Sequence, residues 1–433
     1  MARISIAATG DSVLLTRLPG GYDGFEPVSR FISTADARIT NLETVISDFE
    51  HFPSAFSGGT WINAEPDKLY ELLSFGFNMV GWANNHTLDY SYGGLFSTKR
   101  ELDKSGVAHA GAGMDLDEAS RPAVLDLPNA RLGMISICST FNDAARAGEK
   151  SKAQPGRPGL NPLRFETEYH VSKEHMRALM EIAETTRLNG GNDALRRDGF
   201  LPEPPEGGFY FGSTLFREGL PERKATRVNR IDMERTRKTI ADALNLTDYV
   251  VVLAHSHEIK AADYHEPDEF FIDFCRGCID AGACAVIGSG THQLKPLEIY
   301  KNRPIFYSLG NFIFQTDMIK LLPPDFCEKY GVDINSTAAE ALKARSKNGT
   351  RGLYTDFKNF RSVIPYFEFE GDKLTRLNLM PIELGLGKEK DLVGLPCPAD
   401  DKASREIYSW YKEISRPYGT EMTIHNGIIE VKL

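Results

Sequence analysis

The chain has 433 residues, 41% of them hydrophobic and 25% charged, which is ordinary for a globular protein with a sizeable core. The net charge of −10 argues against a nucleic-acid-binding protein, because such proteins usually carry a basic surface. Six cysteines are too few for a disulfide framework in so long a chain. The first residues lack the cleavage region of a signal peptide and no run approaches roughly 18 apolar residues, so we expect a cytoplasmic protein without a membrane segment.

Two apolar strands with polar ends open the chain. The first is predicted over residues 3–9 and leads to Asp11, whose carboxylate follows a glycine and is well placed for a hard metal ion. The second is predicted over residues 37–44, where Asn41 and Glu43 share a face because alternate residues of a strand point the same way. Each position alone also suits a helix cap or an exposed strand end.

The loop at residues 81–89 follows the next apolar run. Ligands bind at the carboxyl ends of strands in α/β proteins, so this loop is a candidate site. The amide oxygen of Asn85 can bind a metal, and the imidazole of His86 can exchange a proton with whatever the metal holds. Asp89 can hold the tautomer of that imidazole. The alternative is a turn that caps the next helix, which is predicted from about Leu95.

Residues 141–245 differ in character from the rest, because proline and glycine clusters interrupt them. Helices are predicted within them at 175–187 and 231–244. Long irregular segments in compact domains are often functional, so we interpret 141–245 as an insertion or lid within a catalytic body made of residues 1–140 and 246–433. Its arginines suit an acidic substrate, although a solvated surface explains any one of them as well.

The body resumes with an apolar strand at residues 249–254, which leads to His255 and His257. Two histidines separated by one residue can project on the same side as a metal pair. A helix is then predicted over 266–281, and a strand at 283–287 leads to His292. The cysteines of that helix have no suitably spaced fourth ligand, so we interpret them as small buried residues and not as a zinc site.

Strand ends with ligand-type side chains recur along the chain, and the recurrence carries more weight than any one of them. Five such ends, far apart in the sequence, follow apolar strands: Asp11, Glu43, Asn85 with His86, His255 with His257, and His292. A metal site on an α/β scaffold requires such a pattern. The alternation of strands and helices predicts a layered α/β body. After residue 311 we expect a helix near 340–347 and strands at 362–370 and 374–382, but no chemistry.

These motifs resemble the CapA family of capsule and poly-γ-glutamate biosynthesis proteins. The matching pieces are Thr9-Gly10-Asp11, Asn41-Leu42-Glu43, Ala83-Asn84-Asn85-His86 with Asp89, His255, and the long block from Asp280 through His292 to Phe312. The resemblance implies an α/β fold of the calcineurin-like metallophosphatase type, a layered α/β/β/α sandwich with a helical or loop insertion. It also implies metal ligands (Asp11, Glu43, Asn85, His255, His292) and a general acid, His86, braced by Asp89. We assign His257 to catalysis with them, although the family pattern lacks it.

The chain departs from the family pattern at three places. Val13 stands where two-metal phosphoesterases of this fold carry histidine, Ser289-Gly290 where CapA-like proteins usually have histidine, and Ser256-His257 where they usually have Trp-Gly. A site richer in carboxylate and amide favours a harder ion. We therefore expect one or two divalent ions, with manganese, magnesium or calcium favoured over zinc.

The resemblance favours a metal-dependent, hydrolase-like enzyme of poly-γ-glutamate, capsule or peptide metabolism. Its substrate would be a peptide or γ-glutamyl polymer, processed at an amide through metal and histidine acid–base chemistry. Three alternatives stay open: a metal-dependent phosphoesterase, a peptide Cα epimerase, and a non-catalytic accessory protein of polymer biosynthesis. Partner proteins of the same biosynthesis are expected, and nucleic acid is not.

Overall fold

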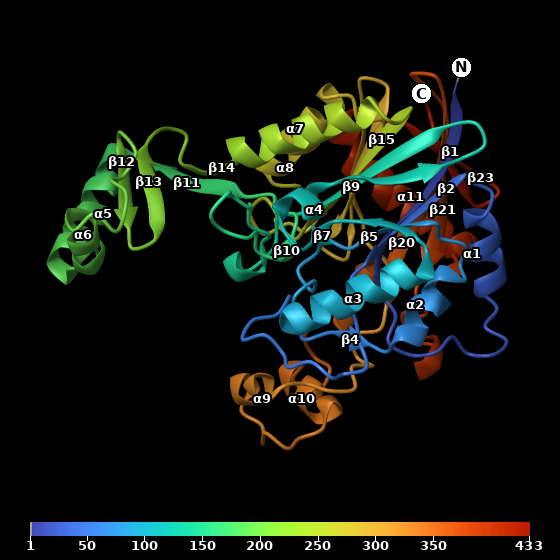
Figure 1. The fold of residues 1–433 in the computed structure, drawn as a ribbon, viewed down its shortest axis with the longest axis horizontal. Helices are drawn as coiled ribbons and strands as arrows, with labels where there is room; N and C mark the ends of the chain where they lie inside the picture. Colours follow the sequence, from blue (N-terminus) through green and yellow to red (C-terminus); the bar gives the residue numbers. More distant parts are fainter. Residues whose placement is uncertain (1) are drawn as a thin grey trace.

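The computed structural model describes residues 2–433, and two facing β-sheets form its centre (Figure 1). The larger sheet has the order β23 (Met422–His425), β24 (Ile428–Val431), β21 (Lys373–Glu383), β20 (Arg361–Glu370), β1 (Arg3–Val13), β2 (Ala37–Leu42), β5 (Met79–Gly81) and β6 (Ala108–Ala110), with β19 (Asn311–Phe314) paired to β1 and β22 (Cys397–Pro398) to β21. The smaller sheet has the order β17 (Leu294–Tyr300), β18 (Arg303–Leu309), β16 (Ala285–Gly290), β15 (Tyr249–Ser256), β9 (Arg131–Cys138) and β8 (Ala123–Asp126). Strands β1, β2 and β5 run parallel in the first sheet, as do β9, β15 and β16 in the second.

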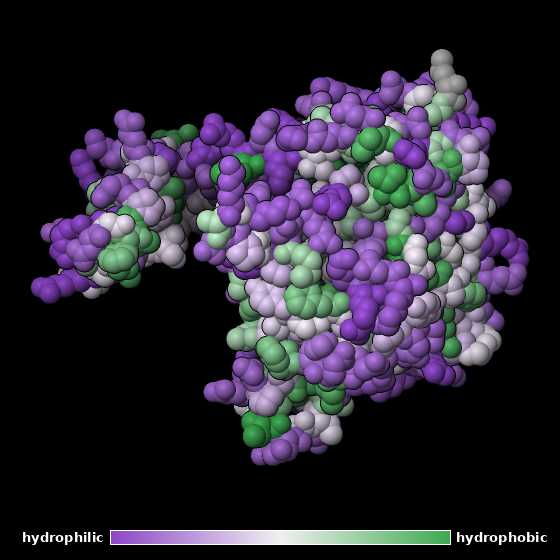
Figure 2. Space-filling view, viewed as in Figure 1, coloured by the Kyte–Doolittle hydropathy of each residue, from purple (hydrophilic) through white to green (hydrophobic). Residues whose placement is uncertain are grey.

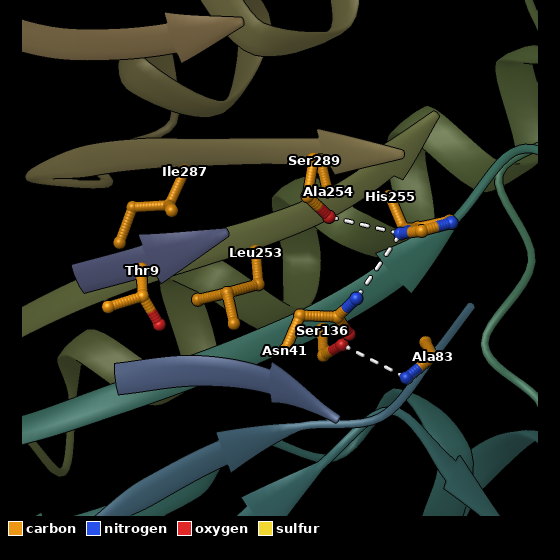
Figure 3. A pocket seen from close by; sticks show the side chains of 9 residues that line it. All are labelled: Thr9, Asn41, Ala83, Ser136, Leu253, Ala254, His255, Ile287 and Ser289. Atoms are coloured by element: carbon orange, nitrogen blue, oxygen red, sulfur yellow. Dashed lines mark hydrogen bonds between the residues drawn. The ribbon is translucent and has the colours of Figure 1, made fainter. Parts of the chain in front are cut away.

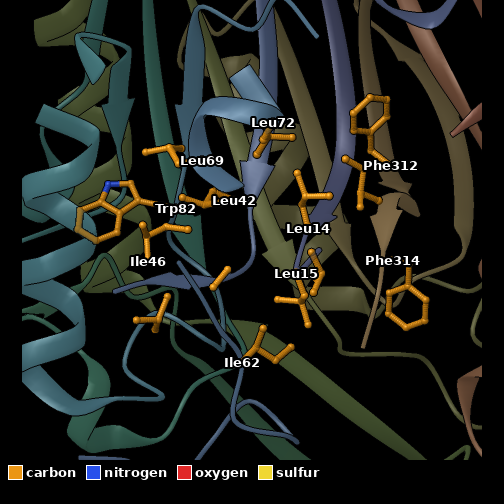
Figure 4. Packing of buried hydrophobic residues seen from close by; sticks show 14 of the residues in the cluster. Leu14, Leu15, Leu42, Ile46, Ile62, Leu69, Leu72, Trp82, Phe312 and Phe314 are labelled. Atoms are coloured by element: carbon orange, nitrogen blue, oxygen red, sulfur yellow. The ribbon is translucent and has the colours of Figure 1, made fainter. Parts of the chain in front are cut away.

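Apolar side chains fill the space between the two sheets, among them Ile6 of β1, Phe306 of β18 and Phe367 of β20. Helices cover the outer faces: α1 (Phe25–Ile32), α2 (Pro66–Leu73) and α3 (Ser91–Ser105) pack on the larger sheet, and α7 (Arg230–Leu244) and α8 (Glu269–Asp280) on the smaller one. Figure 4 shows part of the apolar cluster between the larger sheet and its covering helices, where Leu69 and Leu72 of α2 lie among residues of the strands. The four layers, helix, sheet, sheet and helix, confirm the predicted sandwich.

Two helix boundaries differ from the sequence prediction. Helix α3 begins at Ser91, earlier than expected. Its glycines let the first turn lie close to β3 (Val45–Ile46), since a Cβ at Gly94 would lie 3.0 Å from Val45 Cγ1. Helix α8 begins later than expected, at Glu269, because the side chain of Asp268 caps it by accepting a hydrogen bond from Glu269 N at 2.7 Å.

Residues Phe165–Val228 form an arm (Figure 1). Its outer part projects from the body, whereas Arg223–Val228 at its base packs against α8. Its sheet has the order β12 (Gly208–Phe211), β13 (Thr214–Glu218), β11 (Phe165–Val171) and β14 (Arg223–Val228), with helices α5 (Lys173–Thr186) and α6 (Gly190–Arg197) beside it. Figure 2 shows an open notch between the arm and the body. On either side of the arm the chain packs against the body, since β10 (Gly159–Leu160) pairs with β7 (Ala112–Gly113) and α7 covers β15. The projecting part is therefore shorter than the expected insertion at 141–245.

The remaining elements close the edges of the sandwich. They are β3 (Val45–Ile46) paired with β4 (Asn63–Ala64), the short α4 (Leu116–Ser120), the mutually packed α9 (Pro324–Tyr330) and α10 (Ala338–Arg345), and α11 (Asp401–Ser415). All six cysteines are unpaired, and Cys275 and Cys278 lie on the buried face of α8. Within residues 2–433, no helix combines the length and the apolar character needed to cross a membrane.

Candidate metal centre

The centre lies where the carboxyl ends of β1, β2 and β5 meet those of β15 and β16. Asp11 sits near the end of β1, and its backbone N–H donates to Gly310 O at 2.9 Å. This close approach explains the glycine before it, because a Cβ at Gly10 would lie 1.8 Å from the same oxygen. The backbone of β1 is thereby fixed against the start of β19, and the carboxylate of Asp11 points into the gap between the sheets.

Both carboxylate oxygens of Asp11 are held in a fully buried position. Oδ1 accepts a hydrogen bond from Asn41 Nδ2 at 2.7 Å, and Oδ2 accepts one from Gly290 N at 2.9 Å. Burial alone would raise the pKa of Asp11, but the imidazoles of His255 and His292 outweigh it and lower the pKa well below its ordinary value. Asp11 is therefore an ionised carboxylate with a fixed orientation.

His255, at the end of β15, stands at the middle of the cluster. Its Nδ1 lies 3.0 Å from Ser289 Oγ and 3.3 Å from Asp11 Oδ1. On the other side of the ring, Nε2 lies 2.8 Å from Asn85 Oδ1 and 3.1 Å from His257 Nε2. Figure 3 shows the ring beside Ser289, above a small void that reaches down to Thr9. That void measures about 10 Å³, which is too small for a substrate and at the limit for one water.

Glu43 follows β2 and is the group that most needs a partner. Its side chain is fully buried, yet neither carboxylate oxygen accepts a hydrogen bond from any residue in 2–433. Its Oε1 lies 3.5 Å from His255 Nε2 and 3.9 Å from His86 Nε2. Burial, and then the charges of Asp11 and Asp89, raise the pKa of Glu43 well above its usual range. A cation between these groups would satisfy both oxygens, so this donor set fits a metal ion.

Two overlapping groups of side chains have metal-binding geometry. Asp11, Glu43 and His255 form one, and Glu43, His257 and His292 form the other, with the ligand atoms of each group within 4.8 Å of one another. Burial lowers the pKa values of His257 and His292, which favours the neutral imidazole that a metal binds. Glu43 belongs to both groups.

A histidine–carboxylate pair stands beside these ligands. His86 Nδ1 lies 2.6 Å from Asp89 Oδ2, and Asp89 also accepts hydrogen bonds from Gly58 N at 3.0 Å and Ile62 N at 2.8 Å. A Cβ at Gly58 would lie 2.7 Å from the His86 ring, so only glycine fits against it. The pair fixes the Nδ1 proton toward Asp89 and leaves Nε2 of His86 facing Glu43.

An open cleft of about 240 Å³ gives access to these residues from outside. His86, His257 and His292 line its floor, and its walls carry further residues (Gly58, Gly59, Thr60, Ile62, Tyr264, Thr291, Thr316, Arg345, Leu353). Unlike the void beneath His255, the cleft has room for part of an extended substrate. The three histidines can therefore meet a ligand that enters from solvent.

Every residue that the sequence analysis singles out for the site lies at this one place: Asp11, Glu43, Asn85, His86, Asp89, His255, His257 and His292. His257, assigned there to catalysis, takes a position among the ligand-type side chains. Asn311 was not predicted as a site residue, although it too follows an apolar strand; its Oδ1 accepts a hydrogen bond from His292 Nδ1 at 2.9 Å. Arg345, which no strand end marks, was not predicted either.

Comparison with known proteins connects this site to a family. Residues 5–316 match the family described as bacterial capsule synthesis protein PGA_cap. The chain belongs to that family. This membership confirms the resemblance to CapA. The matched residues include every strand end of the centre, from Asp11 to Asn311.

The relatives of this PGA_cap-family chain differ in how much of it they cover. Uncharacterized protein y4sH of Sinorhizobium fredii is 32% identical over 440 residues, 99% of this chain and 93% of that one. PGA biosynthesis protein CapA of Bacillus subtilis is 23% identical and covers 69% of this chain, which spans 59% of CapA. A solved Staphylococcus aureus protein described provisionally as a 5′-nucleotidase, in complex with alpha-ketoglutarate, aligns over 95% of this chain and 59% of its own at 9% identity and a TM-score of 0.36, a likeness too slight to bear on chemistry.

Proposed function

We propose that this PGA_cap-family protein is a metal-dependent enzyme that processes an amide bond of a γ-glutamyl polymer or a related peptide. The observation that carries the proposal is the pairing of two features at one cleft. The buried Glu43 has two carboxylate oxygens without hydrogen-bond partners, and imidazoles surround them. His86 Nε2 lies 3.9 Å from Glu43 Oε1, and His86 Nδ1 is hydrogen-bonded to Asp89. Together they provide a cation site and a proton donor within reach of one bond.

The residues that would hold the metal are those whose ligand atoms converge: Asp11, Glu43, Asn85, His255, His257 and His292. A bound divalent ion would polarise the carbonyl of the amide and lower the pKa of a water molecule. Three imidazoles beside two carboxylates and an amide oxygen favour manganese among the harder ions, because it accepts both nitrogen and oxygen ligands. Glu43 lies in both ligand groups, so it would help to hold the metal whether one ion or two are bound.

His86 transfers the proton in this proposal. Asp89 accepts a hydrogen bond from Nδ1–H and stabilises the positively charged ring, so that Nε2 can donate its proton to the nitrogen that leaves when the amide breaks. The close fit of Gly58 against the ring prevents His86 from turning away. The same arrangement could donate to the leaving oxygen of a phosphoester, and substrate choice therefore decides between the two reactions.

The experiment has a binding arm and an activity arm. Elemental mass spectrometry of the purified protein measures bound metal in the wild type and in Asp11→Ala and His292→Ala, with His109→Gln on β6 as a histidine control outside the centre. We expect metal in the wild type and the control and its loss in the two site variants. Wild type that binds none under any loading condition would overturn the proposal.

The activity arm uses His86→Asn. This variant should keep its metal, because His86 is outside both ligand groups, and lose about 10²- to 10⁴-fold in the rate of γ-glutamyl amide cleavage. Equal rates for His86→Asn and wild type would remove His86 from the reaction. Turnover of a simple phosphodiester, with none of the γ-glutamyl oligomer, would favour the phosphoesterase instead.

A further inference from the structure

A second hollow adjoins the cleft of the metal centre. It measures about 580 Å³, and Thr316, Arg345 and Leu353 line both the hollow and the cleft, so the two lie side by side at these residues. Helix α10 and the segment that follows it supply most of its wall. No chemistry was predicted from the sequence for this part of the chain.

The wall of the hollow is basic, although the protein as a whole is acidic at a net charge of −10. It carries four cationic side chains, Lys343, Arg345, Arg351 and Lys390, and one carboxylate, Asp317. Within residues 2–433, none of the four cations lies within ion-pair distance of a carboxylate, and Asp317 itself accepts a hydrogen bond from Tyr354 Oη at 2.6 Å. Surface lysines and arginines elsewhere on this chain are mostly paired, so these four are available to an anionic ligand.

Arg345 stands at the junction of the cleft and the hollow. Its guanidinium lies over the ring of Phe326 at 5.8 Å, and Nη1 donates to Thr60 Oγ1, which together fix its orientation. Burial lowers the pKa of Arg345, which means that the cation is partly desolvated with no acid to compensate it. A planar guanidinium held in this way is suited to a carboxylate, which it can bind through two parallel hydrogen bonds.

We propose that Arg345 and the basic hollow form a carboxylate-binding subsite that positions an anionic γ-glutamyl chain beside the metal centre. In a γ-linked chain every unit carries a free carboxylate next to the amide bond. With one amide at His86, Arg345 binds the carboxylate of an adjacent unit, and Lys343, Arg351 and Lys390 face the units beyond. The identity of this chain rests on the proposed function, whereas the binding does not require catalysis.

The test compares two labelled probes by fluorescence anisotropy: a γ-glutamyl oligomer, and the same oligomer with its free carboxylates converted to amides. Wild type should bind the carboxylate form more tightly. In Arg345→Met, which keeps an apolar stem over Phe326, affinity for the carboxylate form should fall about tenfold to a hundredfold, with no change for the amide form. Arg345→Lys should recover part of the preference for the carboxylate probe, because lysine restores the charge but not the two parallel hydrogen bonds of a guanidinium.

A triple variant tests the subsite at exposed positions, where substitution leaves the fold intact. Lys343→Gln, Arg351→Gln and Lys390→Gln change exposed positions only, so the fold is retained, and together they should weaken binding of the carboxylate form and reduce its salt dependence. Lys373→Gln, another exposed and unpaired lysine at the start of β21, is the matched control and should change nothing. Equal affinity of wild type for both probes, or tighter binding of inorganic polyphosphate than of the oligomer, would overturn the proposal.

Binding and turnover separate this proposal from the proposed function. Preference for the carboxylate probe that depends on Arg345, without any cleavage, would support the subsite and refute the amide chemistry. Cleavage of both probes at equal rates by wild type and Arg345→Met would support the amide chemistry and refute the subsite.

Discussion

Strand β15 of the body is buried along its whole length, whereas strands β12 and β13 of the arm are half-buried or exposed at every residue. The helices differ in the same way, since α8 buries three phenylalanines and α6 buries no residue. Strand β11, at the middle of the arm sheet, buries one residue, and that residue is the carboxylate Glu168. The body is therefore stabilised by apolar burial between layers, and the arm has too little apolar interior to be stabilised in that way.

Glu168 shows what stabilises the arm instead. Its carboxylate accepts hydrogen bonds from Arg217 at 2.8 Å and Arg227 at 2.9 Å and lies 2.9 Å from the ring of His170. Several large apolar side chains of the arm, such as Met180 and Phe200, remain exposed. The comparison teaches that the metal centre is built on the part of the chain that apolar burial between layers stabilises. The stability of the arm, by contrast, should depend on pH and salt.

Phe306→Ala should give the largest effect. Phe306 is fully buried between the sheets, so we expect its loss to cost about 3–5 kcal/mol in the free energy of unfolding, measured by urea titration with circular dichroism. Phe216 of the arm is half-buried against Tyr169 at 5.4 Å, and Phe216→Ala should cost only about 1–2 kcal/mol. Equal costs at the two positions would contradict the contrast between body and arm.

The strand ends that carry the centre could be predicted because local pattern determines them. An apolar run that stops at Asp11, Glu43 or His255 marks the end of a buried strand, and parallel strands bring such ends to one edge. The four-layer order of the body follows from the same alternation of strands and helices. The projecting arm could be placed only roughly, because proline and glycine show where regular structure breaks but not where the chain leaves the body.

Arg345 could not be predicted in the same way. It ends a short helix far along the chain, and nothing local distinguishes it from other arginines. It reaches the cleft because residues 316–360 fold back so that Arg345 donates to Thr60, a contact between parts of the chain 285 residues apart. Gly58 is similar, since its need for glycine arises from the side chains of Asn85 and His86, which are distant in the sequence and pack against it. Such long-range placements leave no periodic signal in the sequence.

Glu168→Gln should have the next largest effect, confined to the arm. The variant removes the charge but keeps the volume, and we expect the free energy of opening of the arm to fall by about 2 kcal/mol at neutral pH. Burial would raise the pKa of Glu168, but hydrogen bonds from His170 and Arg217 outweigh it and lower the pKa. The stabilisation is therefore complete above the unfolded-state pKa of about 4.3 and disappears as pH falls below it.

Hydrogen exchange of arm peptides measures this effect across pH. Glu166→Gln, on an exposed position of the same strand, is the matched control and should exchange like the wild type. A difference between Glu168→Gln and wild type that persists undiminished at low pH would mean that the charge of Glu168 is not what stabilises the arm.

Removal of the arm should have the smallest effect on the metal centre. His170 and Arg223 lie opposite each other on the paired strands β11 and β14, so a short glycine-containing turn can replace Val171–Glu222 and leave in place the base of the arm, which packs against α8. No arm residue lines the cleft of His86, His257 and His292, and metal affinity should stay within about twofold of the wild type, less than ~0.5 kcal/mol. If the arm acts as the expected lid, the shortened protein should process short γ-glutamyl oligomers normally and long chains at a raised KM. If the shortened protein bound no metal, the metal centre would depend on the arm, and the inference that apolar burial alone supports the body would be wrong.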